Sequence, residues 1–326
     1  MNENNLKNIG IIMGGYSHEY EISIKSGMVV YKTLKEHYNC YRILINERSW
    51  SLIDEKDDLN KIDAESFQVI NYPNLIFDCI FNAIHGTPGE DGKIQKYFTS
   101  KKIPITGSDS LQSELTFDKV KCLNFLSSKG IKVAPSLSLL KKNKVDFNEI
   151  ERKVGFPCFV KASNSGSSFG VYKVFNRDEM TSCLDLAFEV DDKVLVESYI
   201  DGREFSIGVI CFNGENKVLP ITEIITSNDF FDYEAKYEGK AKEITPAKIS
   251  IELESRLKLL SKDIYNLLDL KGLSRSEFIV NSNGIYFLET NTVPGLSSES
   301  ILPQQLKCAH IDLKDLFINI IEEAIN

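Results

Sequence analysis

Apolar residues in the first third of the chain gather into short runs that are separated by longer, helix-like stretches. The runs at residues 8–15 and 41–45 predict strands, and residues 17–34 between them predict a helix. A third apolar run at residues 75–83 predicts another strand. Strand–helix alternation of this kind is typical of a parallel α/β sheet, which we expect over residues 1–107.

The rest of the chain mixes helices, strands and hairpins in a different order. Five further elements are predicted there: a helix at 116–129 closed by Gly130, strands at 159–161, 194–198 and 204–210, and a hairpin at 272–288. We therefore expect the α/β domain to be followed by two α+β parts, at residues 108–200 and 201–326, that share a cleft.

Length and composition fit this organisation. A chain of 326 residues predicts two or three domains, and 42% hydrophobic with 26% charged residues is ordinary for a globular protein. The net charge of −9 argues against nucleic-acid binding. No apolar run is long enough for a membrane span, residues 1–5 lack signal-peptide character, and the seven cysteines show no CxxC spacing. We expect a cytoplasmic protein without a membrane or nucleic-acid partner.

Two glycine-rich loops follow predicted strands of the first domain. Residues 14–17 (GGYS) lack the third glycine of a dinucleotide-binding loop, so a tight strand-to-helix turn explains them as well. Glu19 then stands in the first helical turn, where it can either complement the helix dipole or receive a substrate ammonium. Residues 85–92 (HGTPGEDG) begin with His85 at the carboxyl end of a strand, where α/β proteins bind ligands.

A lysine before a Ser/Gly loop is a candidate phosphate site. Lys161 precedes the loop 162–170, which has no Walker A pattern but offers a charge and exposed N–H groups to a polyphosphate. Lys119 in the preceding helix is a candidate second cation. Glu197 and Glu204 flank an apolar stretch that suits a purine and a ribose diol. Each feature also has an alternative interpretation. The loop 162–170 could be a flexible turn, Lys119 could be a solvated helix lysine, and residues 194–204 could be an ordinary strand–turn–strand.

The predicted hairpin ends in FLETNTVPG, residues 287–295. Glu289 and Asn291 share one face of a strand, which indicates either a solvated strand end or an oxygen-ligand cation site. A three-residue turn at 282–284 pairs Glu277 with Glu289, and facing carboxylates favour a cation between them. A two-residue Asn-Gly turn would place the two on opposite faces. Arg275 shares the face of Glu277.

Taken together, these motifs resemble those of the ATP-grasp superfamily and, within it, of the D-alanine–D-alanine ligases. The motifs that carry the resemblance occur in the family's order and span residues 9–303: GGYSHEYEIS (14–23), HGTPGEDGKIQ (85–95), FDK (117–119), KASNSGSSFG (161–170), FDYEAKY (231–237) and ETNTVPGLSSESILP (289–303). The resemblance implies an ATP-grasp fold in two subdomains, 108–200 and 201–326, preceded by a Rossmann-like α/β domain. The second subdomain would carry a lid loop and the metal site.

The resemblance also implies roles for individual residues. ATP would be bound by Lys119, Lys161, Ser168, Glu197, Ser198, Tyr199, Ile200, Glu204 and Lys236. Two Mg²⁺ ions, or Mn²⁺ in their place, would be held by Glu277, Glu289 and Asn291. The first D-alanine would be bound by Glu19, Ser167, Tyr237 and His85. The oxyanion would be stabilised by Arg275 and the Gly295 N–H, and the second D-alanine's carboxylate would be received by Ser300 and Ile301.

The implied activity is the ATP-dependent joining of two D-alanines through an acyl phosphate, for peptidoglycan precursor synthesis, in a homodimer. Three positions depart from the family's pattern: Glu277 replaces Asp, Ala162 replaces Pro and Glu299 replaces His. The last change makes the pocket of the second substrate more acidic.

Three alternatives accompany this interpretation. A ligase of the same fold could join D-alanine to D-lactate or D-serine, although Tyr237 favours the dipeptide. A nucleotide-binding protein without catalysis is disfavoured, because each implied phosphate, metal and substrate position holds a chemically competent residue. A dinucleotide oxidoreductase built on residues 14–15 is disfavoured by the missing third glycine.

Overall fold

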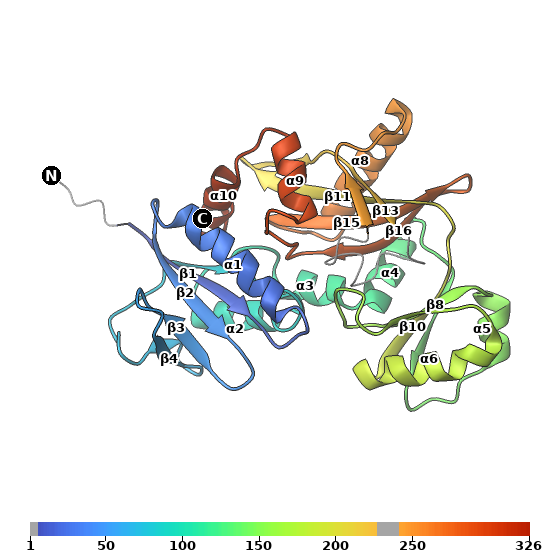
Figure 1. Ribbon diagram of the computed structural model, residues 1–326, viewed down its shortest axis with the longest axis horizontal. Helices are drawn as coiled ribbons and strands as arrows, with labels where there is room; N and C mark the ends of the chain where they lie inside the picture. Colours follow the sequence, from blue (N-terminus) through green and yellow to red (C-terminus); the bar gives the residue numbers. More distant parts are fainter. Residues whose placement is uncertain (1–5, 227–240) are drawn as a thin grey trace.

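The computed structural model describes residues 6–226 and 241–326 and contains three sheets, shown in Figure 1. Lys236 and Tyr237, with the motif 231–237, lie outside the described residues. Within the described part of the chain, no helix is long and apolar enough to cross a membrane.

The first sheet has the strand order β5-β4-β3-β2-β1-β6. Its parallel part contains β1 (Asn8–Gly14), β2 (Asn39–Ile45) and β6 (Cys79–Asn82), with helix α1 (Tyr20–Leu34) between β1 and β2. The predicted strands and helix are therefore confirmed, although β6 begins four residues later than the apolar run 75–83.

The predicted parallel α/β sheet is confirmed for β1, β2 and β6, and three antiparallel strands that the hydrophobic pattern does not predict extend it into a mixed sheet. They are β3 (Trp50–Ile53), β4 (Leu59–Asp63) and β5 (Gln68–Val69). The hydrophobic pattern hides β4 because its two buried positions are Asn60 and Ile62, so that only one of them is apolar.

Helix α1 packs very close to β1. A Cβ at Gly27 would lie 2.7 Å from the Met13 Cβ, and the other buried positions of the helix include Ser23 and Ser26. The Ser23 hydroxyl donates to the Ala83 carbonyl and accepts from the Gly14 N–H, both at 2.8 Å. These small side chains hold the start of the helix against the carboxyl ends of β1 and β6.

The predicted helix 116–129 is wrong as one element. Helix α2 (Lys93–Lys101) is followed by two helices, α3 (Ser110–Phe117) and α4 (Lys119–Ser128), which are separated at Asp118. Asp118 is extended and caps α4 by accepting from the Lys121 N–H at 3.1 Å. Its carboxylate also accepts from Ser163 Oγ at 2.8 Å and Lys193 Nζ at 2.5 Å. Lys119 is consequently the first residue of α4.

The second sheet is antiparallel, with the order β7-β10-β8-β9. Its strands are β7 (Ser136–Leu140), β8 (Cys158–Ala162), β9 (Val171–Val174) and β10 (Lys193–Ser198). Helices α5 (Phe147–Lys153) and α6 (Arg177–Val190) share a buried apolar cluster with the sheet. The opposite face of the sheet is directed toward the rest of the molecule (Figure 1).

The third sheet is antiparallel, with the order β14-β13-β11-β15-β16 and with β12 beside β11. Its strands are β11 (Arg203–Phe212), β12 (Glu215–Val218), β13 (Thr222–Thr226), β14 (Ala241–Ile244), β15 (Leu273–Asn281) and β16 (Gly284–Asn291). Helix α8 (Ile251–Leu267) contributes Leu257 and Ile264 to a cluster with Phe205 and Phe278.

The β15–β16 hairpin has the predicted pairing of its two glutamates but a different turn. Asn281 pairs with Gly284, so the turn has two residues and the predicted three-residue turn is wrong. Phe278 pairs with Phe287 whereas Glu277 pairs with Glu289, which leaves Leu288 as the extra residue of a β-bulge. The bulge restores the register, so the predicted pairing of Glu277 with Glu289 is confirmed.

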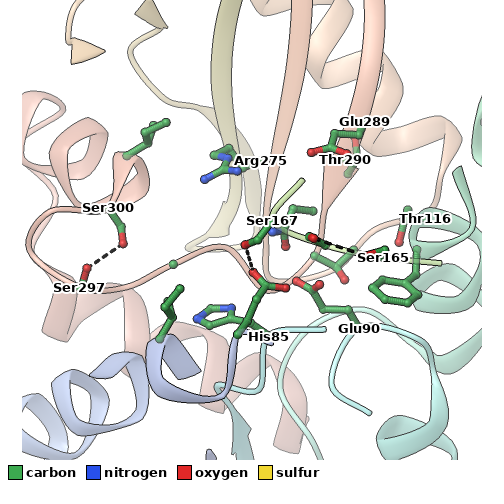
Figure 2. A pocket seen from close by; sticks show the side chains of 18 of the residues that line it. His85, Glu90, Thr116, Ser165, Ser167, Arg275, Glu289, Thr290, Ser297 and Ser300 are labelled. Atoms are coloured by element: carbon green, nitrogen blue, oxygen red, sulfur yellow. Dashed lines mark hydrogen bonds between the residues drawn. The ribbon is translucent and has the colours of Figure 1, made fainter. Parts of the chain in front are cut away.

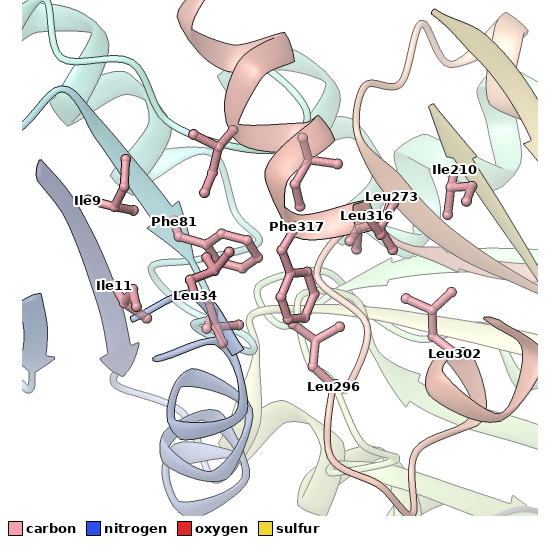
Figure 3. Packing of buried hydrophobic residues seen from close by; sticks show 14 of the residues in the cluster. Ile9, Ile11, Leu34, Phe81, Ile210, Leu273, Leu296, Leu302, Leu316 and Phe317 are labelled. Carbon is pink, nitrogen blue, oxygen red and sulfur yellow. The ribbon is translucent and has the colours of Figure 1, made fainter. Parts of the chain in front are cut away.

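The C-terminal helices α9 (Ile301–Cys308) and α10 (Leu313–Ile325) return to the first sheet. Figure 3 shows Phe317 of α10 against Phe81 of β6, with ring centroids 5.2 Å apart. Both rings belong to a buried cluster that includes Ile9, Ile11 and Leu34, and burying one Phe side chain contributes about 1.5–3 kcal/mol. This packing fixes the first sheet relative to the third and thereby defines the cavity between them.

Candidate active site

Two adjoining cavities lie where the three sheets meet. The larger, of about 330 Å³, is lined by α1, the loop after β6, the loop after β8, β15, β16 and the start of α9. The smaller, of about 100 Å³, lies between the second and third sheets. Lys119 and Glu289 line both cavities and mark their junction. We call the larger one the substrate cavity and the smaller one the nucleotide cavity, after the ligands that the sequence motifs predict for their lining residues.

Glu19 immediately precedes α1 and lies at the floor of the substrate cavity. Its carboxylate is 8% exposed and accepts a short hydrogen bond from Ser167 Oγ. Gly166 makes this contact possible, because a Cβ there would lie 2.3 Å from Glu19 Oε2. Ser167 and Ser168 both have positive φ, 47° and 59°, so the loop is held in a strained conformation against the first domain.

His85 is also buried in the substrate cavity. Its Nδ1 is 2.7 Å from the Val293 carbonyl, which can only accept, so Nδ1 carries the proton. Its Nε2 lies 2.8 Å from Ser26 Oγ. Burial lowers the pKa of His85, which keeps the ring neutral and fixes it between α1 and the loop after β16.

Glu90 is a buried carboxylate of this cavity that the sequence analysis does not assign to the site. It is 6% exposed, and its Oε2 accepts from the Gly86 N–H at 3.0 Å. Its Oε1 has no hydrogen-bond partner among the described residues. Burial, together with the nearby charge of Glu19, raises the pKa of Glu90 well above its ordinary value. Glu90 belongs to the HGTPGEDG motif, but the motif alone does not reveal that it is buried.

Figure 2 shows the two sides of the substrate cavity. His85 and Glu90 lie on one side, Arg275 and Glu289 lie on the other, and Ser165 and Ser167 lie between them. Residues that are far apart in the sequence therefore meet in one space.

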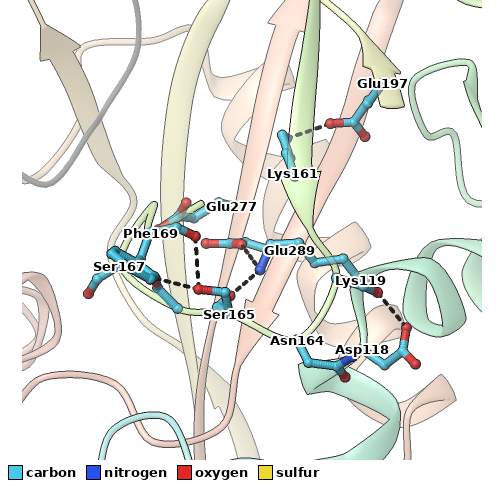
Figure 4. Close-up of polar contacts among 12 residues, drawn as sticks. Asp118, Lys119, Lys161, Asn164, Ser165, Ser167, Phe169, Glu197, Glu277 and Glu289 are labelled. Atoms are coloured by element: carbon cyan, nitrogen blue, oxygen red, sulfur yellow. Dashed lines mark hydrogen bonds and ion pairs between the residues drawn. The ribbon is translucent and has the colours of Figure 1, made fainter. Parts of the chain in front are cut away.

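Of the predicted phosphate lysines, Lys119 lines both cavities and Lys161 lines the nucleotide cavity. Lys119 Nζ donates to the Ser165 carbonyl at 2.5 Å and lies 3.5 Å from Glu289 Oε2. Lys161 Nζ lies 2.5 Å from Glu197 Oε2, in a pair that Figure 4 shows beside the loop after β8. Burial alone would lower the pKa of Lys161, but the charge of Glu197 outweighs it, so that the pKa is raised and the lysine stays charged.

The walls of the nucleotide cavity combine polar and apolar residues. Ser168, Ser198, Ile200 and Glu204 line it, as the sequence analysis expects of nucleotide-binding residues. Tyr199 is not among the lining residues, and its N–H donates to the Pro157 carbonyl at 3.1 Å. The apolar lining residues, which the sequence analysis does not name, are Phe159, Val171, Leu195, Ile279 and Leu288. The sequence could have indicated two of them, because Leu288 precedes the predicted metal ligand Glu289 and Ile279 lies two residues after the predicted ligand Glu277.

Glu277, Glu289 and Asn291 converge on one face of the hairpin. Glu277 is 4% exposed and pairs with Arg275 Nη2 at 2.8 Å, and Asn291 Oδ1 accepts from the Val293 N–H at 2.8 Å. Among the described residues, no group of three or more His, Cys, Asp or Glu side chains could hold a metal. The predicted set has only two acidic residues and an amide, all of them oxygen donors, which is the chemistry that Mg²⁺ prefers. Two carboxylates paired across strands fit a cation between them.

The start of α9 forms the far end of the substrate cavity. Ser300 precedes the helix, its Oγ lies 2.9 Å from Ser297 Oγ, and Ile301 is the first helical residue. A Cβ at Gly295 would lie 2.6 Å from Ser300 Oγ, so this turn approaches the helix closely. All four residues line the cavity, and the free N–H groups of a helix start suit a carboxylate.

The family model described as D-ala D-ala ligase N-terminus matches residues 8–108, and that described as D-ala D-ala ligase C-terminus matches residues 125–322. A D-alanine–D-alanine ligase of Flavobacterium johnsoniae is 52% identical over 319 residues, covering 97% of this chain and 99% of the relative.

Solved structures are similar over the same length. The VanG D-Ala:D-Ser ligase of Enterococcus faecalis has a TM-score of 0.86 at 31% identity, covering 97% of this chain and 99% of that one. The D-alanine–D-alanine ligase of Bacillus anthracis complexed with ATP has a TM-score of 0.79 at 31% identity, covering 99% and 97%.

Proposed function

Because the chain belongs to the D-alanine–D-alanine ligase family, we propose a role for each part of its two cavities in that reaction. The chain is an ATP-dependent ligase with an ATP-grasp fold, and it joins two D-alanines for peptidoglycan precursor synthesis. The observation that carries the proposal is the junction of the cavities, where Lys119 and Glu289 line both the substrate cavity and the nucleotide cavity.

We propose three domains with the bounds 1–107, 108–200 and 201–326. Each range contains one complete sheet, which supports these bounds. The second and third ranges would be the two ATP-grasp subdomains that enclose the nucleotide.

In the nucleotide cavity, the apolar residues of the walls would hold adenine, and Glu204 would accept hydrogen bonds from the ribose hydroxyls. Glu197 would orient Lys161 toward the phosphates, because the two are already paired at 2.5 Å. Lys119 would meet the phosphates at the junction. Ser198, Tyr199 and Ile200 would frame adenine, and Tyr199 would do so through backbone atoms other than its engaged N–H. Lys236 would reach the γ-phosphate from outside the described residues.

Glu277, Glu289 and Asn291 would hold two Mg²⁺ ions, or Mn²⁺ in their place. When bound, such ions supply positive charge that neutralises the oxygens of the transferring phosphoryl group. The pairing of Glu277 with Glu289, and the position of Glu289 at the junction, support this assignment.

Glu19 would bind the ammonium of the first D-alanine, with His85 beside it and with Ser167 and Tyr237 closing the loops over it. The carboxylate of that D-alanine would attack the γ-phosphorus, the bond from this phosphorus to the β,γ-bridging oxygen would break, and ADP would leave. Because an acyl phosphate reacts readily with water, the closed loop at Gly166–Ser168 would serve to exclude solvent.

The second D-alanine would lie at the start of α9, with its carboxylate at Ser300 and Ile301. Its ammonium would first release a proton to water, and the neutral amine would attack the acyl carbon to give a tetrahedral oxyanion, which Arg275 and the Gly295 N–H would stabilise. The attacking nitrogen would then release a second proton to water. The bond from that carbon to the phosphate oxygen would then break, and phosphate would leave with the bonding electrons.

We also propose that the protein acts in the cytoplasm, as a homodimer. The family is the support for both statements. Light scattering of the purified chain tests the dimer, which would be contradicted by a mass near 36.9 kDa.

The test of the function is ATP-dependent phosphate release with D-alanine, D-lactate, D-serine and L-alanine, alone and in pairs. We expect release with D-alanine alone. Release that requires added D-lactate or D-serine would instead identify a ligase for that acceptor, and no release with any of them would contradict the proposal. The D-serine arm matters because of the similarity to a D-Ala:D-Ser ligase.

A further inference from the structure

Glu243 of β14 lines the substrate cavity, and neither the motifs nor the proposed mechanism uses it. We propose that Glu243 binds the ammonium of the second D-alanine and thereby selects an amino acid over a hydroxy acid as the acceptor. This inference rests on the proposed function, because it assigns a residue to the acceptor end of that site.

The register of the third sheet places Glu243 on its active face. Glu243 pairs with Ile224, Ile224 pairs with Glu204, and Glu204 pairs with Ile279. Paired residues share a face, and Ile279 lies two residues from Glu277 on the same strand. Glu243 therefore projects from the same face as the predicted metal ligands and the predicted ribose ligand.

One hydrogen bond ties Glu243 to the acceptor end of the cavity. Gln304 Nε2 donates to Glu243 Oε2 at 2.7 Å, and the same nitrogen donates to the Glu299 carbonyl at 3.1 Å. Glu299 immediately precedes Ser300, where α9 begins. The carboxylate of Glu243 and the anion-binding start of α9 thus lie within reach of one nitrogen atom. An α-amino acid carries its ammonium and its carboxylate on neighbouring atoms, so it matches this arrangement.

The charges of the cavity favour a cation beside Glu243. Glu243 is half-buried, and its hydrogen bond from Gln304 is neutral, whereas Arg275 is paired with Glu277 at 2.8 Å. Burial raises the pKa of Glu243, although the hydrogen bond from Gln304 and the charge of Arg275 oppose this rise, so the carboxylate is incompletely solvated and gains from a further cation. Glu19, the carboxylate for the first ammonium, lies across the cavity on the first domain.

D-Lactate has a hydroxyl where D-alanine has the ammonium. It would bring no positive charge to Glu243, and its hydroxyl could donate only one neutral hydrogen bond to the carboxylate. Loss of a charged hydrogen bond of this kind should weaken the binding of an amino-acid acceptor about tenfold or more and leave a neutral nucleophile unaffected.

The experiment compares Glu243→Gln with the wild-type holoenzyme in ATP, Mg²⁺, D-alanine and hydroxylamine. Hydroxylamine is uncharged at neutral pH and traps the acyl phosphate as D-alanyl hydroxamate without needing an ammonium site. The ratio of dipeptide to hydroxamate therefore reports the acceptor end alone. We expect this ratio to fall about tenfold or more in Glu243→Gln, and total phosphate release with hydroxylamine to stay within about twofold.

Two variants serve as controls. Glu243→Asp keeps the charge and should recover most of the ratio. Lys242→Gln removes a charge at the exposed neighbouring position of β14, which points to the other face, and should leave the ratio unchanged. In a parallel assay with D-lactate, the ratio of ester to hydroxamate should not fall in Glu243→Gln.

A dipeptide-to-hydroxamate ratio within twofold of wild type would overturn the inference. Equal losses for D-alanine, D-lactate and hydroxylamine would also overturn it, because they would show a structural role for Glu243. If the wild type made neither dipeptide nor hydroxamate from ATP and D-alanine, the proposed function itself would fail, and the inference would fail with it.

Discussion

The two adjoining cavities differ in the donors that bind their buried carboxylates. In the nucleotide cavity, the buried carboxylate of Glu197 faces Lys161 Nζ at 2.5 Å, so the protein itself supplies the compensating charge. In the substrate cavity, the hydrogen bonds to the side chains of Glu19, Glu90 and Glu243 come from neutral donors within the described residues: a serine hydroxyl, a backbone N–H and a glutamine amide.

This difference indicates what each cavity receives. We propose that the nucleotide cavity presents a preformed cation, Lys161, to polyphosphate, and that its counterion Glu197 holds it in place. The substrate cavity holds carboxylates whose compensation would come from two amino-acid ammonium groups. We infer that the nucleotide side is complete before binding and that the substrate side is completed by its ligands.

The largest loss of activity should come from a change at the junction of the two cavities. Glu289→Gln keeps the shape of the side chain but removes the charge that faces Glu277 and Lys119. We expect phosphate release with D-alanine to fall by about 10³-fold or more, because charge stabilisation at the transferring phosphoryl group is lost.

Circular dichroism of the Glu289→Gln variant should match that of the wild type, which separates lost catalysis from lost folding. Activity within tenfold of the wild type would contradict the assignment of Glu289 to the metal site.

The next effect concerns the ion pair of the nucleotide cavity. Lys161→Met leaves Glu197 buried without its counterion, and breaking a buried pair in this way costs about 3–5 kcal/mol. Urea unfolding should show this loss. The double variant Lys161→Met/Glu197→Gln should regain most of the stability while still binding ATP weakly. If both variants unfolded at the same urea concentration, Glu197 would not depend on Lys161 for its charge.

The smallest effect is a change in stability at Glu90, and it depends on pH. Burial raises its pKa well above the ordinary value, so between about pH 4.3 and the raised pKa the folded protein binds more protons than the unfolded chain. Its contribution to the free energy of unfolding is therefore largest in acid and falls as the pH rises. Glu90→Gln removes that fall.

For Glu90→Gln we expect a higher melting temperature than wild type at pH 8, by about 2–4 °C for each kcal/mol gained, and a difference that shrinks toward pH 4. Calorimetry across this range measures it. A constant difference at every pH would mean that Glu90 does not titrate differently in the folded state.

Much of the fold follows from the hydrophobic pattern, and the misses have physical causes. The first two strands and the helix between them are predictable because their apolar runs are long. The strands β3 to β5 are missed because they are short and because Asn60 occupies an inward position of β4. The break at Asp118 is missed because its causes, Lys193 and Ser163, are distant in sequence.

In the site, too, features that depend on nearby residues are predictable, and features that depend on residues distant in the sequence are not. The pairing of Glu277 with Glu289 is predicted correctly from a wrong turn, because a bulge at Leu288 compensates for the shorter turn. Motifs identify the residues with charges and loops, such as Lys161 and Glu19. They do not identify Glu90 or Glu243, because the importance of these carboxylates depends on burial and on Gln304, which only the folded chain brings together.

The central claim is that the two cavities join so that the carboxylate of the first D-alanine reaches the γ-phosphorus. The direct test uses D-alanine labelled with ¹⁸O in both carboxylate oxygens and measures the released phosphate by mass spectrometry. We expect one ¹⁸O atom in each phosphate, because the attacking oxygen stays on phosphorus when the acyl bond breaks. Phosphate without ¹⁸O, released together with dipeptide, would contradict it.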